Sequence, residues 1–429
     1  GEADRGFFWN MNISKAELIY RKNVLWNVVA GIINAAEAVI IVAVVSRVNG
    51  LKDAGILTFA FSVANLLMTV GKFGVRNYQV VHESEEYSFQ DFFHFRMVTV
   101  GIMVVSAVIY TFYNLRIYDG VSQKMACVFW VCMWYAVEAF EDVFAGSFQA
   151  RGRLDVGSKM FSVRWILTLC AFIAADFVSK DIVKSAICGF AVCFISGTVF
   201  IIYTYFKYMD KNKWHVSKGM GVLFKESISL CIASYLYIYI TNIPKYAINT
   251  YLGDETQAVY GYISMPVFVI ALLNSFIYRP QYVLYSTEWK EHKIQQFSHR
   301  VMRQMLVLVV IVVVCLLGAF LLGIPVLSVL YHENLSPYKV HLLETLFASG
   351  FLAVGGFLAN IFTVMDEQKR AMLIYLVVSL AGRVIIYHMA AQYQLSGAVW
   401  GYMITMILLA VVFGIAYVGI LKKAGHDRC

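Results

Sequence analysis

The chain has 429 residues, of which 60% are hydrophobic and only 14% are charged, a composition far from that of a soluble globular domain. Its net charge of +8 comes from basic residues concentrated in the short segments between apolar runs. We therefore interpret the charge as a membrane-topology signal, with anionic lipid headgroups as neighbours, and expect no nucleic-acid partner.

Apolar runs of about twenty residues recur along the chain, and each can cross a ~30 Å hydrocarbon layer as a helix. We predict twelve transmembrane helices, at 24–46, 52–74, 92–113, 121–146, 156–178, 182–206, 222–250, 256–280, 301–330, 339–364, 370–392 and 396–421. The first run keeps full membrane length, so we do not expect a cleavable signal peptide. The predicted class is a multi-pass, all-α membrane protein.

A basic linker at 207–221 divides these helices into six at 1–206 and six at 222–429. Shifting one half by 203 residues sets Val75–Val80 against Tyr278–Val283, which indicates a distant internal duplication. Halves with six helices each share one orientation in the membrane. We therefore expect two six-helix bundles related by a pseudo-two-fold axis along the membrane normal, with a site between them near the midplane.

Lys and Arg are concentrated in the two termini and in the loops on the same side of the predicted membrane. Positive residues favour the cytoplasmic side, so both termini are predicted to be cytoplasmic.

The helix at 52–74 introduces a polar face with residues spaced three and four apart. Its members are Thr58, Ser62, Asn65, Thr69, Lys72 and Arg76. Polar groups in hydrocarbon are costly, so this face must contact protein or water. We expect a water-filled cavity that binds substrate through Asn65, Lys72 and Arg76. Helix–helix packing is the alternative, and the two cations would then extend to the interface.

The helix at 222–250 carries a second polar face, made of Tyr235, Tyr239, Asn242, Tyr246 and Asn249, with Lys245 on its flank. Tyrosine rings stack on sugars, while amides and hydroxyls bond sugar hydroxyl groups, so this face favours an oligosaccharide. An aromatic belt at the membrane interface is the alternative. The ammonium of Lys245, inside a span, requires an anion or water.

Arg383 lies near the centre of the helix at 370–392, with Tyr387 one turn later. Its planar guanidinium matches phosphate oxygens. We expect it to form a cationic, substrate-binding cavity between the bundles together with Lys72, Arg76, Lys245 and Arg279. Such a cavity predicts an anionic substrate. An ion pair of Arg383 with Glu344 or Asp366 is the alternative.

Three acids inside the apolar spans are candidates for ion coupling: Glu37, Glu138 and Glu141. Carboxyl groups in a low dielectric can carry protons through a transport cycle. They can equally be fixed partners for Arg164 or the other cations.

Signatures of enzymes and metal sites are not found in the sequence. There is no His-Glu-x-x-His spacing, no Gly-x-x-x-x-Gly-Lys loop and no Cys-x-x-Cys pair. We predict no catalytic residues, no metal site and no cofactor.

Four stretches of the sequence resemble a known family. Asn49–Gly55, Thr58–Ala60 and Lys72–Arg76 resemble the first two helices of bacterial polysaccharide flippases, which belong to the multidrug/oligosaccharidyl-lipid/polysaccharide exporter (MOP) superfamily. Phe148–Arg153 resembles the junction of that family's fourth and fifth helices.

The resemblance implies a carrier in the bacterial inner (cytoplasmic) membrane. It would move an oligosaccharide, joined by pyrophosphate to a polyprenol, from the cytoplasmic to the outer leaflet by alternating access. The product would enter the assembly of O-antigen, capsule or exopolysaccharide. Glycosyltransferases and a glycan polymerase would be its partners.

Two alternatives remain open. A cation-coupled multidrug exporter of the same superfamily would need an acidic cavity for its cationic substrates, and the basic faces argue against it. A membrane glycan polymerase would need large outer loops with catalytic acids or arginines, and the predicted loops are short.

Overall fold

The computed structural model describes residues 2–83, 87–117, 122–208, 220–267, 269–270, 273–274 and 281–426. Over these ranges the regular secondary structure is helical, apart from a single isolated bridge between Glu83 and Tyr87. Nine helices within them are long and apolar enough to cross a membrane. The prediction of a multi-pass helical membrane protein is therefore confirmed.

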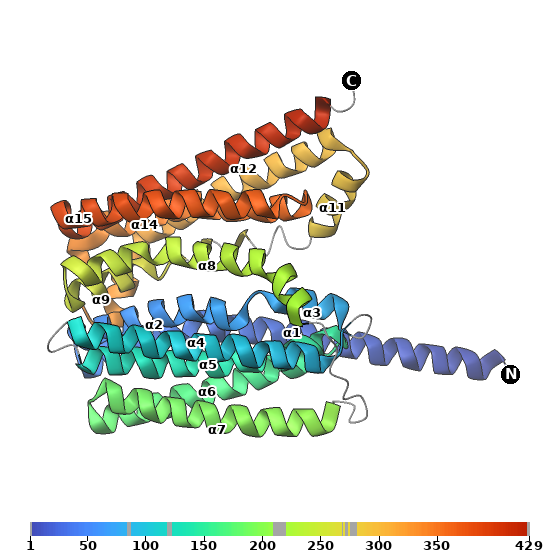
Figure 1. Cartoon of the computed structure of the whole chain (residues 1–429), viewed down its shortest axis with the longest axis horizontal. Coiled ribbons are helices and arrows are strands. Elements are labelled where there is room, and N and C mark those ends of the chain that lie inside the picture. Colours follow the sequence, from blue (N-terminus) through green and yellow to red (C-terminus); the bar gives the residue numbers. More distant parts are fainter. Residues whose placement is uncertain are drawn as a thin grey trace. The chain divides into compact units, whose positions relative to one another are not determined.

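The chain forms two compact units. Unit 1 comprises Gly1–Val48 and Val63–Cys231. It contains α1 (Glu2–Val48), the last part of α2 (Leu51–Lys72), α3 (Val75–His82), α4 (Phe89–Ile117), α5 (Ser122–Ala150), α6 (Leu154–Ser179), α7 (Ile182–Tyr208) and the start of α8 (Met220–Tyr251) (Figure 1).

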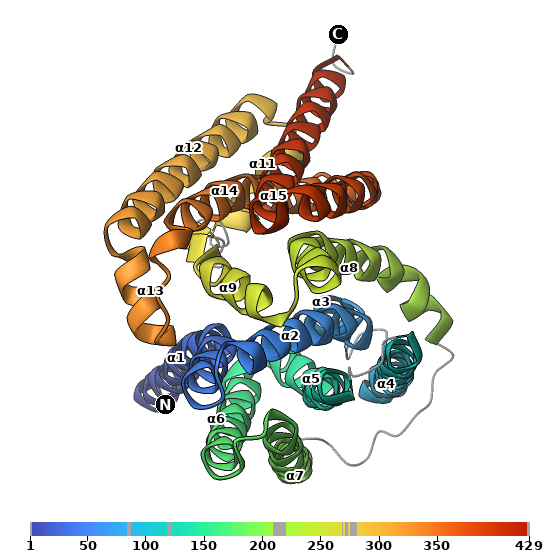
Figure 2. The ribbon, with the colours of Figure 1, turned by 90° about the vertical axis from the view of Figure 1, so that its left-hand side faces the viewer.

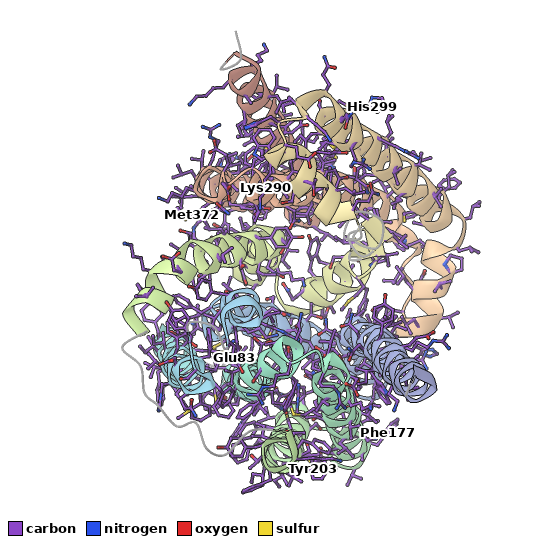
Figure 3. The ribbon with its side chains drawn as sticks, turned by 90° about the vertical axis from the view of Figure 1, so that its right-hand side faces the viewer. Glu83, Phe177, Tyr203, Lys290, His299 and Met372 are labelled. Atoms are coloured by element: carbon purple, nitrogen blue, oxygen red, sulfur yellow. The ribbon has the colours of Figure 1, made fainter. Side chains whose placement is uncertain are left out.

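Helix α5 is the buried centre of unit 1. It packs against α4, α6 and α7, which Figure 2 shows nearly end-on. Most of its residues are buried, among them Trp134, Glu138, Glu141 and Asp142. By contrast, Phe177 of α6 and Tyr203 of α7 project from the outer surface of the unit (Figure 3), with 61% and 56% of each exposed. An apolar outside and a charged inside suit a bundle whose outer solvent is lipid.

The predicted helix at 52–74 ends at Lys72, because Phe73 and Gly74 both take positive φ angles, of 50° and 68°. A left-handed pair ends the helical hydrogen-bonding pattern, and α3 begins at Val75. The prediction that Arg76 continues the polar face of this helix is therefore wrong. Arg76 lies in the first turn of α3.

Unit 2 comprises Asn49–Ser62 and Ile232–Cys429. It contains the start of α2, most of α8, and then α9 (Asp254–Ser264), α11 (Tyr282–Lys290), α12 (Ile294–Gly318), α13 (Ile324–Tyr331), α14 (Lys339–Val364) and α15 (Gln368–His426). A π-helical turn, Ala319–Gly323, joins α12 to α13, and a short 3-10 turn, Ser336–Tyr338, precedes α14. Helix α14 packs against both α12 and α15 (Figure 2).

Gln394 divides α15 in two, because its φ of 53° and ψ of −133° are not helical. This break falls between the predicted helices at 370–392 and 396–421. The predicted helix at 256–280 begins as α9, and much of its second half lies outside the described residues. So does 209–219, most of the predicted linker, and the predicted domain boundaries stay predictions.

Candidate functional site

The acids of α5 in unit 1 are paired with cations from neighbouring helices. Glu138 Oε1 lies 2.7 Å from the Lys72 ammonium, and Glu141 Oε2 accepts a 2.6 Å hydrogen bond from Arg164 Nε. Arg164 Nη2 also lies 3.7 Å from Glu138 Oε2, so the two ion pairs are joined. The side chain of Arg164 is fully buried. Gly197 of α7 provides the space for the Glu141 carboxylate, since a Cβ at this position would lie 2.8 Å from Glu141 Oε1.

Asp142 binds two arginines. Its Oδ1 lies 3.0 Å from Arg76 Nη1 and its Oδ2 lies 2.9 Å from Arg96 Nη2. Arg96 is buried and also donates to the carbonyl oxygen of Gly71 at 2.8 Å. Arg76 donates twice to Gln149 Oε1. Four cations, Lys72, Arg76, Arg96 and Arg164, are thus each bound to an acid of α5.

These ion pairs match the alternative in which the acids are fixed partners of the cations. Sequence reasoning missed Arg96, because a basic residue near the start of an apolar run also fits a position at the membrane interface. The facing acid, Asp142 in the second half of α5, was the only available signal. Lys72 and Arg76 keep 31% and 35% of their side chains exposed, so their role in substrate binding stays a prediction.

Glu37 of α1 differs from the three acids of α5. Only 4% of it is exposed, and its Oε1 accepts a 3.1 Å hydrogen bond from the Tyr135 hydroxyl, which also bonds Asn65. Its Oε2 has no hydrogen-bond partner, and the described part of the chain holds no cation within ion-pair distance of it. Burying a carboxylate without a counter-ion costs far more than burying a neutral carboxyl group. Glu37 is therefore better suited than the three acids of α5 to take up a proton.

Three tyrosines of α8 form a row in unit 2. The rings of Tyr235 and Tyr239 are nearly parallel, 4° apart with centroids separated by 6.4 Å. Tyr239 and Tyr246 follow at 5.9 Å and 23°. The Tyr246 hydroxyl donates to the Ser62 carbonyl oxygen at 3.1 Å, which fixes the end of the row. We call Tyr235, Tyr239 and Tyr246 the tyrosine row; all three are half-buried.

Arg383 of α15 is held against this row. Its Nη1 donates to the Tyr239 hydroxyl at 2.9 Å, and its Cζ lies 4.9 Å from the centre of the Tyr387 ring. The predicted alternative, a pair with Glu344 or Asp366, is wrong. In the described part of the chain Arg383 has no salt bridge, and Glu344 instead accepts from Trp400 Nε1 at 3.0 Å. Arg383 is exposed, so its charge is available to a ligand.

Lys245 lies on a different face of α8. It lines a cavity of about 280 Å³ inside unit 2, together with Asn242, whose amide donates to the Ile238 carbonyl oxygen at 2.9 Å. Among the described residues Lys245 forms no salt bridge and no hydrogen bond. The two cations of unit 2 therefore do not share one surface: Arg383 borders the tyrosine row, and Lys245 faces the cavity. Arg279, the remaining predicted cation, lies outside the described residues.

Comparison with protein families gave one match. A family model described as "Polysaccharide biosynthesis protein" matches residues 20–279, more than half of the chain. A search of curated proteins found no match.

Solved transporter structures share the fold. An inward-facing multidrug resistance MATE family transporter of the MOP superfamily is similar with a TM-score of 0.70 and 12% identity, over 91% of this chain and 96% of that one. An outward-facing one gives a TM-score of 0.63, 14% identity, and coverage of 95% and 97%. A point mutant of the Vibrio cholerae MATE transporter VcmN gives a TM-score of 0.63, 11% identity, and coverage of 96% and 98%.

These likenesses confirm the predicted fold class, a membrane protein of twelve transmembrane helices in two bundles. The three solved structures named above are each described as transporters.

Proposed function

The chain belongs to the polysaccharide biosynthesis protein family, a family of MOP-superfamily membrane transporters, and we propose that it flips a lipid-linked oligosaccharide across the membrane. The substrate is an oligosaccharide joined by pyrophosphate to a polyprenol. It moves from the cytoplasmic to the outer leaflet by alternating access, for surface polysaccharide assembly. The membrane is the bacterial inner membrane, with both termini in the cytoplasm.

The tyrosine row with Arg383 is the observation that carries this proposal. Parallel aromatic rings offer flat surfaces for the apolar faces of sugar rings, and their hydroxyls reach the sugar hydroxyls. Arg383 is already oriented by the Tyr239 hydroxyl and by the ring of Tyr387. An oriented guanidinium loses little freedom when it binds two oxygens of a diphosphate. One surface thus serves both chemical parts of the substrate.

The other predicted binding residues complete the proposed site. Asn242 and Lys245 are proposed to contact the substrate from the cavity face of α8. Arg279, which lies outside the described residues, is proposed as a further cation of the site. In unit 1, Asn65, Lys72 and Arg76 are proposed to contact the glycolipid through their exposed parts.

We place ion coupling at Glu37. The α5 acids Glu138 and Glu141 are bound to cations, so protonating either would break an ion pair. Glu37 has only the Tyr135 hydroxyl, and it can gain or lose a proton without that loss. Glycosyltransferases would supply the glycolipid, and a glycan polymerase would use it on the outer side.

The alternative is a cation-coupled multidrug exporter with cationic substrates; a solved structure of this fold is described as a multidrug resistance MATE family transporter. A site for a cationic drug needs an unpaired acid beside an aromatic surface. Beside the tyrosine row lies an exposed arginine instead, which repels such substrates.

Translocation in proteoliposomes tests the proposal. Purified protein is reconstituted with a fluorescent oligosaccharide–pyrophosphate–polyprenol, and transfer between leaflets is followed by periodate accessibility. Wild-type protein should accelerate transfer over protein-free vesicles. Tyr239→Ala should slow it about tenfold, the effect of losing one stacking contact of roughly 1.4 kcal/mol.

Tyr113→Ala is the matched control, since Tyr113 lies 65% exposed on α4 of unit 1, whereas the tyrosine row belongs to unit 2. It should leave transfer unchanged. No acceleration by the wild-type protein, or equal loss in both variants, would remove the proposal.

A further inference from the structure

The cavity around Lys245 has a chemistry of its own. Its lining comes from α8, α9, α14 and α15, all within unit 2, and it holds no Asp or Glu among the described residues. Lys245 is the one charged residue of that described lining. An ammonium inside a membrane protein, without a carboxylate, needs an anion or water to stabilise it. The cavity therefore excludes cations and favours an anionic group.

Hydrogen bonds already made within the helices decide what the other lining groups offer. Thr241 donates to the Ile238 carbonyl oxygen at 2.8 Å, Thr345 to the His341 carbonyl oxygen at 2.7 Å, and Ser349 to the Leu346 carbonyl oxygen at 2.6 Å. A hydroxyl has one proton to donate, so these three can offer only lone pairs to a ligand. They accept hydrogen bonds from ligand hydroxyl groups.

Other residues of the lining provide the hydrogen-bond donors. Lys245 offers three N–H groups, and the hydroxyls of Tyr260 and Tyr402 make no hydrogen bond within the described residues. Both tyrosines are only 2% exposed. A ligand that satisfies the whole lining must therefore bring an anionic acceptor for Lys245 and the tyrosines, and hydroxyl donors for the threonines and the serine.

The volume of the cavity limits the class of ligand further. The volume of about 280 Å³ lies just below the ~300–1,000 Å³ of pockets that bind drug-sized ligands. It suits one sugar ring. A neutral sugar would leave the ammonium without a counter-ion, and a small inorganic anion would leave the hydroxyl acceptors unused.

We infer that the Lys245 cavity binds a single sugar residue that carries a carboxylate, with the carboxylate on Lys245 and the sugar hydroxyls on Thr241, Thr345 and Ser349. This inference rests on the proposed function, because it makes the cavity a subsite for an acidic residue of the transported glycan. Selection of acidic over neutral glycans would then come from Lys245, and the tyrosine row would bind both kinds.

Binding of a free monosaccharide tests the inference without any lipid substrate. Protein in nanodiscs is titrated with glucuronate, glucose and acetate, and binding is measured by calorimetry. Glucuronate should bind at least tenfold more tightly than either of the others. Equal binding of glucose would show that the carboxylate of the ligand does not contribute to affinity. Equal binding of acetate would show that the sugar hydroxyls do not contribute. Either result overturns the inference.

Two variants separate the cavity from the rest of the protein. Lys245→Met keeps the length of the side chain without its charge and should weaken glucuronate binding roughly tenfold to a hundredfold. Lys293→Met, at an exposed lysine of the same unit, should leave it unchanged. Unchanged affinity in Lys245→Met contradicts the inference. If this variant does not fold, wild-type protein is tested with glucuronamide, which should bind at least tenfold more weakly than glucuronate.

Translocation then distinguishes this inference from the proposed function. Glucuronate should compete with transfer of a lipid-linked glycan that contains a hexuronic acid, and much less with a neutral one. Glucuronate that binds without slowing either transfer indicates a site for a free metabolite and overturns the substrate subsite. Equal transfer of both glycans, with no glucuronate binding, leaves the flippase intact and removes the subsite. Failure to transfer any glycolipid removes the flippase, whatever glucuronate does.

Discussion

Replacing Arg164 tests whether the ion pairs of α5 stabilise unit 1. The side chain of Arg164 is fully buried, and that of Glu141 is 4% exposed, with 2.6 Å between the paired atoms. Arg164→Met leaves Glu141 as a buried carboxylate without a cation, while Glu138 keeps Lys72. Breaking a buried pair in this way costs about 3–5 kcal/mol, or roughly a hundredfold to several thousandfold in the unfolding equilibrium. A typical folding free energy is about 5–15 kcal/mol, so the loss is large.

The free energy of unfolding is measured by SDS titration in mixed micelles, with tryptophan fluorescence as the signal. Arg21→Met is the control, because Arg21 forms an ion pair with Glu17 while 75% of its side chain is exposed. That change should cost less than about 1 kcal/mol. The double variant Arg164→Met, Glu141→Gln should recover most of the loss, because no unpaired charge remains.

Two results would refute this reasoning. One is a cost for Arg164→Met no larger than that of the control. The other is a double variant no more stable than the single one, which would show that Arg164 acts through packing and not through its charge.

Two further predictions concern single substitutions, one at Glu37 and one at Gly55. Glu37→Gln should keep the protein folded and abolish the dependence of translocation on an imposed proton gradient, because a carboxamide takes up no proton. Glu17→Gln, on the exposed part of α1, should keep that dependence. A gradient response that survives in Glu37→Gln would exclude Glu37 as the coupling residue. Gly55→Ala should lower the thermal stability of the purified protein, because the added Cβ would lie 1.7 Å from the backbone carbonyl oxygen of Asp254 in α9. Gly101→Ala is the control. Its Cβ would have nothing within 4 Å, so the change should be neutral or stabilising. Equal stability of the two glycine variants would contradict the close helix contact.

The apolar runs made the helices predictable, because a membrane requires about twenty apolar residues for each crossing. Residue spacing on one helix was equally reliable: the tyrosines placed on one face of 222–250 do form a row. The break at Phe73 and Gly74 was not predicted, since a glycine at the end of an apolar run fits both a helix and its termination.

Partners across helices could not be predicted, because spacing on one helix carries no information about the facing one. Arg383 was given Glu344 or Asp366 as alternative partners, yet it contacts Tyr239 and Tyr387. Lys72 was expected in a cavity and is bound to Glu138. The separation of Lys245 from Arg383 likewise depends on how α15 packs against α8, which the sequence of either helix does not contain.

A structure of the protein with its lipid-linked oligosaccharide bound tests the central proposal most directly. We expect diphosphate oxygens within hydrogen-bonding distance of the Arg383 guanidinium, and a sugar ring lying on Tyr239. A diphosphate bound elsewhere, with Arg383 still bonded only to the Tyr239 hydroxyl, would contradict the proposed site.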